Sequence, residues 1–282
     1  MNHVIITLVF FLLSLNSFGT AQIPDILIYK GDTLSLFDCP LESYPNKELL
    51  NPKGLFGSRG CFFTACWRNY IATWVIEDDK LYLKEIRNAC YPTEMKGVSV
   101  SYKSGVNTDS IGCEYADLNT LFPDKYKNGR VLADWVNGQM YSPRGKLMYY
   151  IHDGFQSIYE NELEFSFKDG LLVNIREFDN SKTKKSKYMD NSVLLRKFIN
   201  ENLDYTGIPN PAEKAKVFIT IVSATDEGKI DSVRILRGID KFRDAEAIRV
   251  VKSIPEWDVL YRHGKRFSMG WTIPIIFGTE TK

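Results

Sequence analysis

The chain contains few histidines and almost no net charge, and both absences narrow its possible functions. Only 3 histidines occur among the 282 residues, and the formal net charge is +1 at pH 7. A protein that binds nucleic acid usually carries a basic patch that neutralises phosphates, and a balanced charge leaves no such footprint. We therefore expect no nucleic acid among the partners of this protein.

The 5 cysteines do not have the spacing of a metal or redox site. The stretch CFFTAC lacks the two-residue spacing of CxxC motifs, and no histidine nearby completes a metal set, so we expect no metal and no cofactor. In an exported protein the cysteines could form disulfides, with one thiol left over, or remain buried thiols. The sequence does not say which of them pair. They are Cys39, Cys61, Cys66, Cys90 and Cys113.

The sequence also has little that predicts catalysis. The glycines of FGSRGC come without a lysine, so a phosphate-binding loop is not indicated. His152 and Asp153 are neighbours, but adjacent residues of a strand point to opposite faces and should not meet. A hydrolase with a site near His152 is a remote alternative, and a hydrogen-bonded histidine in a loop or at a strand end is favoured. We expect a non-catalytic protein.

The one long apolar run is at the N-terminus. Residues 4–13 have the length of a signal-peptide core, and Gly19 and Ala21 are small residues at the spacing that signal peptidase prefers. We therefore predict a signal peptide at residues 1–21 and a periplasmic protein that is not inserted in the membrane after cleavage. The alternative is a retained inner-membrane anchor, which needs roughly 20 mostly apolar residues.

Residues 22–178 have the pattern of an antiparallel β-rich domain of unknown function. Aromatic and β-branched runs form three hairpin patterns, and two of these carry the strong turn signals Asn137-Gly138 and Asp169-Gly170. The lysine-rich stretch DNSKTKKSKYMDNS follows and has no hydrophobic periodicity. It predicts a polar linker at residues 179–191.

Residues 192–282 have the pattern of a small α+β domain. Two antiparallel strands and a final strand cannot hide their own apolar face, and two amphipathic helices are enough to cover it. The predicted order is helix, strand, strand, helix, strand, with a three-stranded antiparallel sheet, so the whole chain is predicted to be α+β. The segments are SVLLRKFINENL, KVFITIVSATDEGKIDSVRILRG, DAEAIRVVKSIPEW and RFSMGWTIPIIF.

This region resembles the C-terminal domain of the TonB family of energy transducers. The resemblance is carried by Tyr205, Pro211-Ala212, the hairpin DEGKIDSVRILRGID, the helix DAEAIRVVKSIPEW, Gly264 and the closing IPIIF. It implies a non-enzymatic periplasmic domain that pairs with a short extended peptide of a TonB-dependent outer-membrane transporter. In that family the peptide adds beside the last strand.

The last strand also predicts partner binding by its own pattern. Pro274 cannot donate a ladder hydrogen bond, so its strand should lie at a sheet edge or carry a bulge. An exposed edge offers unpaired N–H and C=O groups to a strand of another protein, which is β-augmentation. We predict an exported protein that binds a partner peptide in this way; an anchored TonB-type transducer is the alternative. The assigned partner-binding residues are Tyr205, Phe267, Ser268, Met269, Gly270, Trp271, Thr272 and Ile273.

Mass spectrometry of the mature N-terminus tests the signal-peptide prediction. Protein isolated from the periplasm of an expression host is expected to begin at Gln22, because signal peptidase cleaves after the small residue Ala21. A chain that still begins at Met1 would contradict cleavage and would favour the anchored transducer.

Overall fold

The structure is a computed structural model that describes residues 20–57, 60, 64–90 and 114–278. Most of the predicted signal peptide, together with Cys61 and Cys113, lies outside these residues. None of the helices within the described ranges is long and apolar enough to cross a membrane.

The chain divides into two compact units. The first runs to Gly145 and includes Tyr150–Ser157 and Glu162–Glu177; the second takes in Lys146–Tyr149, Ile158–Asn161 and the chain from Phe178 onward.

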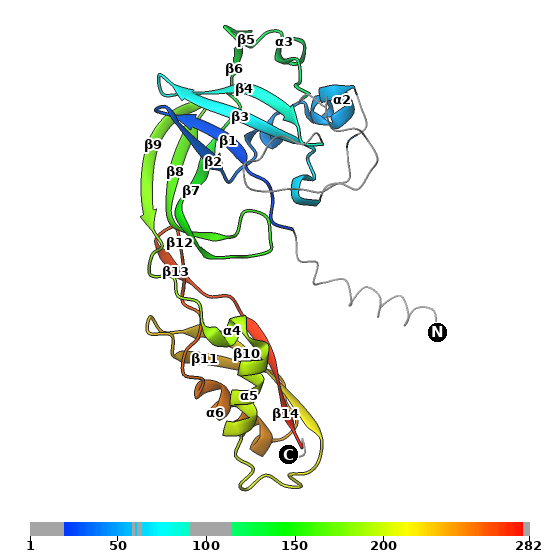
Figure 1. The fold of residues 1–282 in the computed structure, drawn as a ribbon, viewed down its shortest axis with the longest axis vertical. Helices are drawn as coiled ribbons and strands as arrows, with labels where there is room; N and C mark the ends of the chain where they lie inside the picture. Colours follow the sequence, from blue (N-terminus) through cyan, green and yellow to red (C-terminus); the bar gives the residue numbers. More distant parts are fainter. Residues whose placement is uncertain (1–19, 58–59, 61–63, 91–113, 279–282) are drawn as a thin grey trace, which may run out of the picture. The chain divides into compact units, whose positions relative to one another are not determined.

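The largest sheet has nine strands, seven of them in the order β2-β1-β3-β4-β9-β8-β7, while β6 pairs with β4 and β5 (Figure 1). Tight turns in which residues adopt positive φ close its hairpins, as at Asp78-Asp79 and Asp169-Gly170. The strands are β1 Asp25–Tyr29, β2 Asp32–Leu36, β3 Tyr70–Glu77, β4 Lys80–Asn88, β5 Tyr126–Lys127, β6 Arg130–Leu132, β7 Gly138–Tyr149, β8 Ile158–Lys168 and β9 Leu171–Asp179.

Short helices and large apolar side chains complete the first unit. Trp74, Leu83 and Phe165 are fully buried in its core. The helices each span one turn or little more. They are the 3₁₀ helices η1 Pro40–Ser43, η2 Lys47–Leu50 and η3 Thr64–Cys66, and the α-helices α2 Pro52–Phe56 and α3 Leu118–Leu121.

The sheet is mixed, so the predicted antiparallel β-rich domain is wrong in its topology. β1 runs parallel to β3, with pairs from Ile26↔Thr73 to Tyr29↔Ile76. This pairing joins segments more than forty residues apart, as the numbering of the paired residues shows. The hairpin signals report only contacts between neighbours in the chain, so they could not reveal a parallel partner.

The second unit contains a three-stranded sheet in the order β11-β10-β14 and a separate two-stranded hairpin of β12 and β13. Two helices, α5 and α6, pack on one face of the three-stranded sheet. Their side chains share one core with those of the sheet, which includes Ile199, Ile219, Val250 and Ile275. The elements are α4 Lys187–Asp190, α5 Ser192–Asn202, β10 Ala215–Ala224, β11 Ile230–Arg237, α6 Lys241–Lys252, β12 Leu260–Arg262, β13 Lys265–Phe267 and β14 Trp271–Phe277.

The predicted α+β fold class is wrong. The structure is mostly β, with 43% strand and 20% helix, and the nine-stranded sheet takes up much of the chain. A small TonB-like C-terminal domain is not evident either. The β12–β13 hairpin stands between α6 and β14, which breaks the predicted order, and the compact unit extends well beyond residues 192–282. The sequence patterns describe each element separately. Burial against distant segments decides which elements join one unit, so these patterns could not predict the fold class or the extent of the second unit.

The segment predicted as a polar linker, residues 179–191, lies inside the second unit. Lys184 forms an antiparallel bridge with Val259, and the amide of each residue donates to the carbonyl of the other. Tyr188 of α4 is buried in the core against Phe198. The segment therefore combines exposed lysines with a few side chains that are buried in the core.

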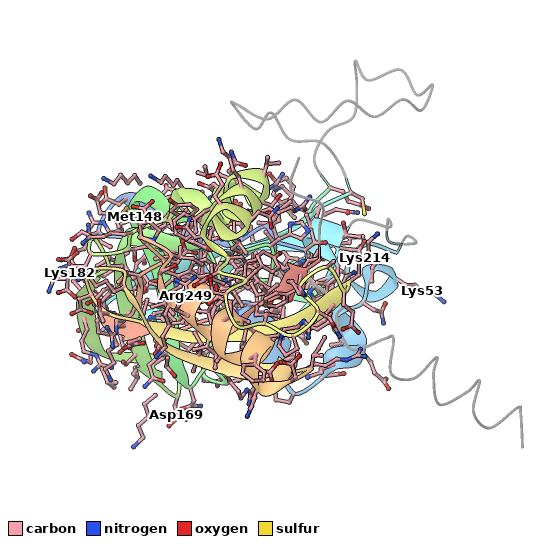
Figure 2. The ribbon with its side chains drawn as sticks, turned by 90° about the horizontal axis from the view of Figure 1, so that it is seen from below. Lys53, Met148, Asp169, Lys182, Lys214 and Arg249 are labelled. Carbon is pink, nitrogen blue, oxygen red and sulfur yellow. The ribbon has the colours of Figure 1, made fainter. Side chains whose placement is uncertain are left out.

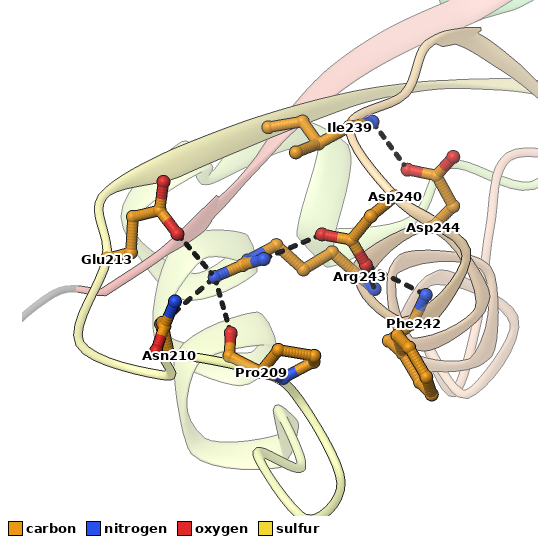
Figure 3. Close-up of polar contacts among 8 residues, drawn as sticks. All are labelled: Pro209, Asn210, Glu213, Ile239, Asp240, Phe242, Arg243 and Asp244. Atoms are coloured by element: carbon orange, nitrogen blue, oxygen red, sulfur yellow. Dashed lines mark hydrogen bonds and ion pairs between the residues drawn. The ribbon is translucent and has the colours of Figure 1, made fainter.

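A buried arginine on α6 holds the chain before β10 in place (Figure 3). Nη2 of Arg243 donates to the carbonyl oxygens of Pro209 at 2.9 Å and Asn210 at 3.0 Å, and lies 3.4 Å from Oε2 of Glu213. Nη1 donates to Oδ2 of Asp240 at 2.6 Å, while the other oxygen of Asp240 caps the helix. One guanidinium therefore joins the start of α6 to the loop that leads into the sheet.

Replacement of this arginine should destabilise the second unit. Arg243→Ala leaves two carbonyl groups and the carboxylates of Asp240 and Glu213 without this donor, and we expect a loss of about 2–3 kcal/mol in the free energy of unfolding. Hydrogen–deuterium exchange of the β10 and α6 amides measures the loss in the second unit separately from the first.

Arg249→Ala is the matched control on the same helix. The side chain of Arg249 is 50% exposed and pairs with Glu246, and its position on α6 is labelled in Figure 2. Its loss should cost at most about 1 kcal/mol. Equal effects of the two substitutions would contradict the role assigned to Arg243.

Candidate functional site

The outer edge of β14 is the candidate site. β14 lies at one end of the three-stranded sheet, and no strand among the described residues pairs with its other side. All 7 residues of β14 pair with β10 without a register shift, from Ala215↔Phe277 to Ile221↔Trp271. The prediction that this strand lies at a sheet edge is therefore confirmed, and the edge it presents is regular.

Pro274 indicates which backbone groups face outward. A proline fits a strand where its missing N–H would point to solvent, and alternate residues of a strand direct their backbone groups to opposite edges. Thr272, Pro274 and Ile276 therefore face the open edge. The side chains support this register, since the hydroxyls of Thr220 and Thr272 lie 2.9 Å apart and directly opposed side chains approach most closely in pairs that exchange no backbone hydrogen bonds.

The opposite edge of the same sheet, β11, is irregular. Its pairing with β10 contains three register shifts, between Phe218 and Ile219, between Ile221 and Ser223, and between Ser223 and Ala224. Bulges bend and twist a strand, and natural sheets use them to prevent unwanted strand addition. β14 is therefore the better of the two edges for accepting another strand.

A groove of about 300 Å³ runs between α5 and β14. Leu195 and Ile199 of α5 contribute apolar side chains to it, and Arg196 is its one charged lining residue. The helix is held at this position by Asn191, whose Oδ1 accepts hydrogen bonds from the amides of Val193 and Leu194. The full lining is Ser192, Leu195, Arg196, Ile199, Asn200, Ile273, Pro274 and Ile276.

The structure brings only some of the predicted binding residues to this edge. Trp271, Thr272 and Ile273 belong to β14, whereas Phe267 belongs to β13 and pairs with Leu260. Tyr205 is partly buried and packs against the core, with its ring centroid 6.2 Å from that of Phe277. The remaining three, Ser268, Met269 and Gly270, lie between the two strands.

The sequence prediction missed α5 as part of the site. The apolar stripe of this helix was assigned to the core, and Ile199 is indeed buried there. Leu195 is only partly buried and lines the groove. A signal was available, because Arg196 and Asn200 are polar residues four apart that stand next to the stripe. Only the tertiary structure shows that these two residues lie next to β14.

Ser268, Met269 and Trp271 border a much smaller pocket near a buried carboxylate, Asp258. Oδ2 of Asp258 accepts the hydroxyl of Tyr149 at 2.7 Å, and Oδ1 accepts the amide of Ser186 at 2.7 Å. Burial raises the pKa of Asp258, and these two donors offset part of the increase. The arrangement ties together distant parts of the second unit and is explained by stability.

His152 is exposed, and its Nδ1 forms a 2.9 Å hydrogen bond with the hydroxyl of Tyr150. Among the described residues no serine, cysteine or carboxylate pairs with this ring. No group of three His, Cys, Asp or Glu side chains in the same part of the chain is placed to hold a metal ion. The hydrolase alternative therefore gains no geometric support from the residues around His152.

The described cysteines are of two kinds. Cys90 is disulfide-bonded, whereas Cys39 and Cys66 are free. Burial raises the pKa of Cys39 to about 12 and also raises the pKa of Cys66. Both thiols are therefore protonated at neutral pH and poorly nucleophilic.

A buried ion pair in the first unit has a structural role. Asp25 accepts hydrogen bonds from Nη2 of Arg68 at 2.9 Å, the indole of Trp74 at 3.0 Å and the amide of Ala72 at 3.1 Å. Burial raises the pKa of Asp25, and these donors oppose the increase. Both side chains are almost completely inaccessible, so the pair offers no surface for a ligand. The ion pair joins β1 to the turn before β3, and the bonds from Ala72 and Trp74 join β1 to β3 itself.

Comparisons with known proteins identify no relative: no family model, no curated protein and no solved structure matches the chain.

The raised pKa of Asp258 makes a prediction about pH. The folded state holds this proton more tightly than the unfolded state. The stability that Asp258 contributes is therefore fully present at low pH and is lost as pH rises from the ordinary value of 3.8 through the folded pKa. The substitution Asp258→Asn should remove this part of the pH dependence. Calorimetry of both proteins between about pH 4 and pH 7 is expected to show the wild type losing Tm relative to the variant. Parallel pH profiles would contradict the assignment.

Proposed function

We propose that this chain is an exported, periplasmic, non-catalytic binding protein whose second unit takes up an extended segment of a partner protein beside β14. The observation that carries the proposal is the regular outer edge of β14, which pairs with no described strand and lies next to the α5–β14 groove. The edge can supply backbone hydrogen bonds, and the groove can seat side chains of the added segment. Neither feature depends on the family resemblance, which stays a prediction.

The expected interaction is of moderate strength. A backbone hydrogen bond contributes about 0.5–1.5 kcal/mol net, and burial of one Val, Leu or Ile side chain contributes about 1.5–3 kcal/mol. Ordering the peptide and fixing its position oppose these gains. A short segment should therefore bind reversibly, as is suitable for a transient contact between proteins.

The partner is proposed as a class. Any protein that presents a short extended segment in the periplasm would meet the requirements of the edge. The outer-membrane transporter that the resemblance implies is one member of this class. The anchored transducer would need the apolar N-terminal run to be retained in the mature chain.

A proline at the edge tests strand addition. Random heptapeptides displayed on phage are selected for binding to the wild-type protein, and the selected peptides are then measured by fluorescence anisotropy. Thr272→Pro removes an outward N–H and places a ring in the path of the added strand, so we expect at least about a tenfold loss of affinity.

Thr272→Val is the matched control. Both substitutions remove the hydroxyl contact with Thr220, but the valine keeps the backbone N–H, so its affinity should stay within about threefold of the wild type. Hydrogen exchange of β10 verifies that both variants remain folded. Failure to select any peptide, or equal binding by the two variants, would refute the proposal.

A further inference from the structure

We propose that Gln22, the first residue of the mature chain, cyclises to pyroglutamate and that the fold of the first unit promotes this reaction. The inference rests on the export that the proposed function includes, because removal of residues 1–21 creates the free α-amine that reacts. It assigns a site of covalent modification to the first unit.

Gln22 is held in place through its main chain and its side chain. Its amide donates to the carbonyl of Gly154 at 3.0 Å, and the amide of Ile23 donates to the carbonyl of Ala65 at 2.7 Å. The side-chain Nε2 donates to the carbonyl of Thr64 at 2.8 Å. These bonds fix the start of the mature chain to two segments that lie far along the sequence.

The side chain of Gln22 is folded back along the chain. Its Nε2 also donates to the carbonyl of Thr20 at 3.0 Å, two residues upstream. The carboxamide therefore lies on the N-terminal side of Gln22, where cleavage after Ala21 exposes the amine. Closure of the lactam ring requires this amine to reach Cδ of the same residue, and groups that are already held close together react faster.

The reaction needs no partner molecule. The lone pair of the α-amine attacks Cδ, and a new C–N bond forms while the bond from Cδ to Nε2 breaks. Nε2 leaves as ammonia with a proton from the attacking amine, and nothing is oxidised or reduced. The product is a neutral lactam, and the chain is lighter by one molecule of ammonia.

The surroundings of Gln22 favour the neutral lactam over an ammonium beside a free carboxamide. Gln22 is half-buried, and burial disfavours the charged form of an amine. The charge would also arise close to the buried guanidinium of Arg68, whose Nη2 donates to the carbonyl of Ile23 at 2.8 Å. Asp25 pairs with this guanidinium and offsets part of the repulsion. Oε1 of Gln22 is buried and accepts no hydrogen bond from any described residue, so the free carboxamide is not fully satisfied either.

Mass spectrometry of the N-terminal peptide tests the modification. The protein is expressed with its signal sequence and isolated from the periplasm. Its amines are labelled in denaturant before digestion, so that cyclisation during the workup is not counted. We expect the N-terminal peptide to begin at Gln22, to lack one molecule of ammonia and to carry no label on its N-terminal nitrogen.

A synthetic peptide of residues 22–30 is the unfolded reference. It is kept at the same pH and temperature for the same time as the protein. No fold holds its carboxamide beside the amine, so its rate of cyclisation should be at least about tenfold lower than that of the folded protein.

Gln22→Asn is the matched control within the protein. Asparagine keeps the carboxamide but is one methylene too short to close the same ring, so the α-amine of this variant should be labelled. Circular dichroism verifies that the variant is folded. A block that persists in Gln22→Asn would show another N-terminal modification and would overturn the assignment.

The outcomes also separate this inference from the proposed function. A chain that begins at Gln22 with a free amine, or that cyclises no faster than the synthetic peptide, would overturn the assisted cyclisation while export stands. A chain that begins at Met1 would overturn both, because Gln22 then has no free amine.

Discussion

The outer backbone edge of β14, with which no described strand pairs, is the feature on which the candidate site depends. Its outward N–H and C=O groups are strong hydrogen-bonding groups that must remain bonded to water or to a partner. A flat surface that covered them would leave them unsatisfied, at about 1–3 kcal/mol for each group. Only an occupant with a matching row of donors and acceptors avoids this loss. The regular pairing with β10 keeps the row straight enough for such an occupant.

The helical layer places apolar and charged side chains next to this edge. The Asn191 cap starts α5, and Ile199 fixes the helix to the core, while Leu195 and Arg196 extend beyond it toward β14. The same short helix therefore packs on the core and lines the groove. Arg243 contributes from the other helix, because it holds the loop before β10, the strand on which the register of β14 depends.

Local sequence patterns predicted single elements well and assemblies poorly. Pro274 correctly indicated an edge strand, and alternate residues of β14, such as Ile275 and Phe277, face the core. The period-2 pattern also continued through Phe267, however, and this residue belongs to a different hairpin. A Ser-Met-Gly connection breaks the run, and periodicity alone cannot locate such a break, because loop residues with the right polarity satisfy it equally well.

The sequence by itself determined the local features of this protein: the turn at Asp169-Gly170, the apolar stripes of α5 and α6, and the proline that marks β14. These depend on residues near one another in the chain. The tertiary structure decided the mostly β fold, the parallel pairing of β1 with β3, and the meeting of α5 with β14 around Arg196. Each of these is a choice among distant partners, made by burial and backbone pairing over long stretches of intervening chain, and no short window of sequence contains it.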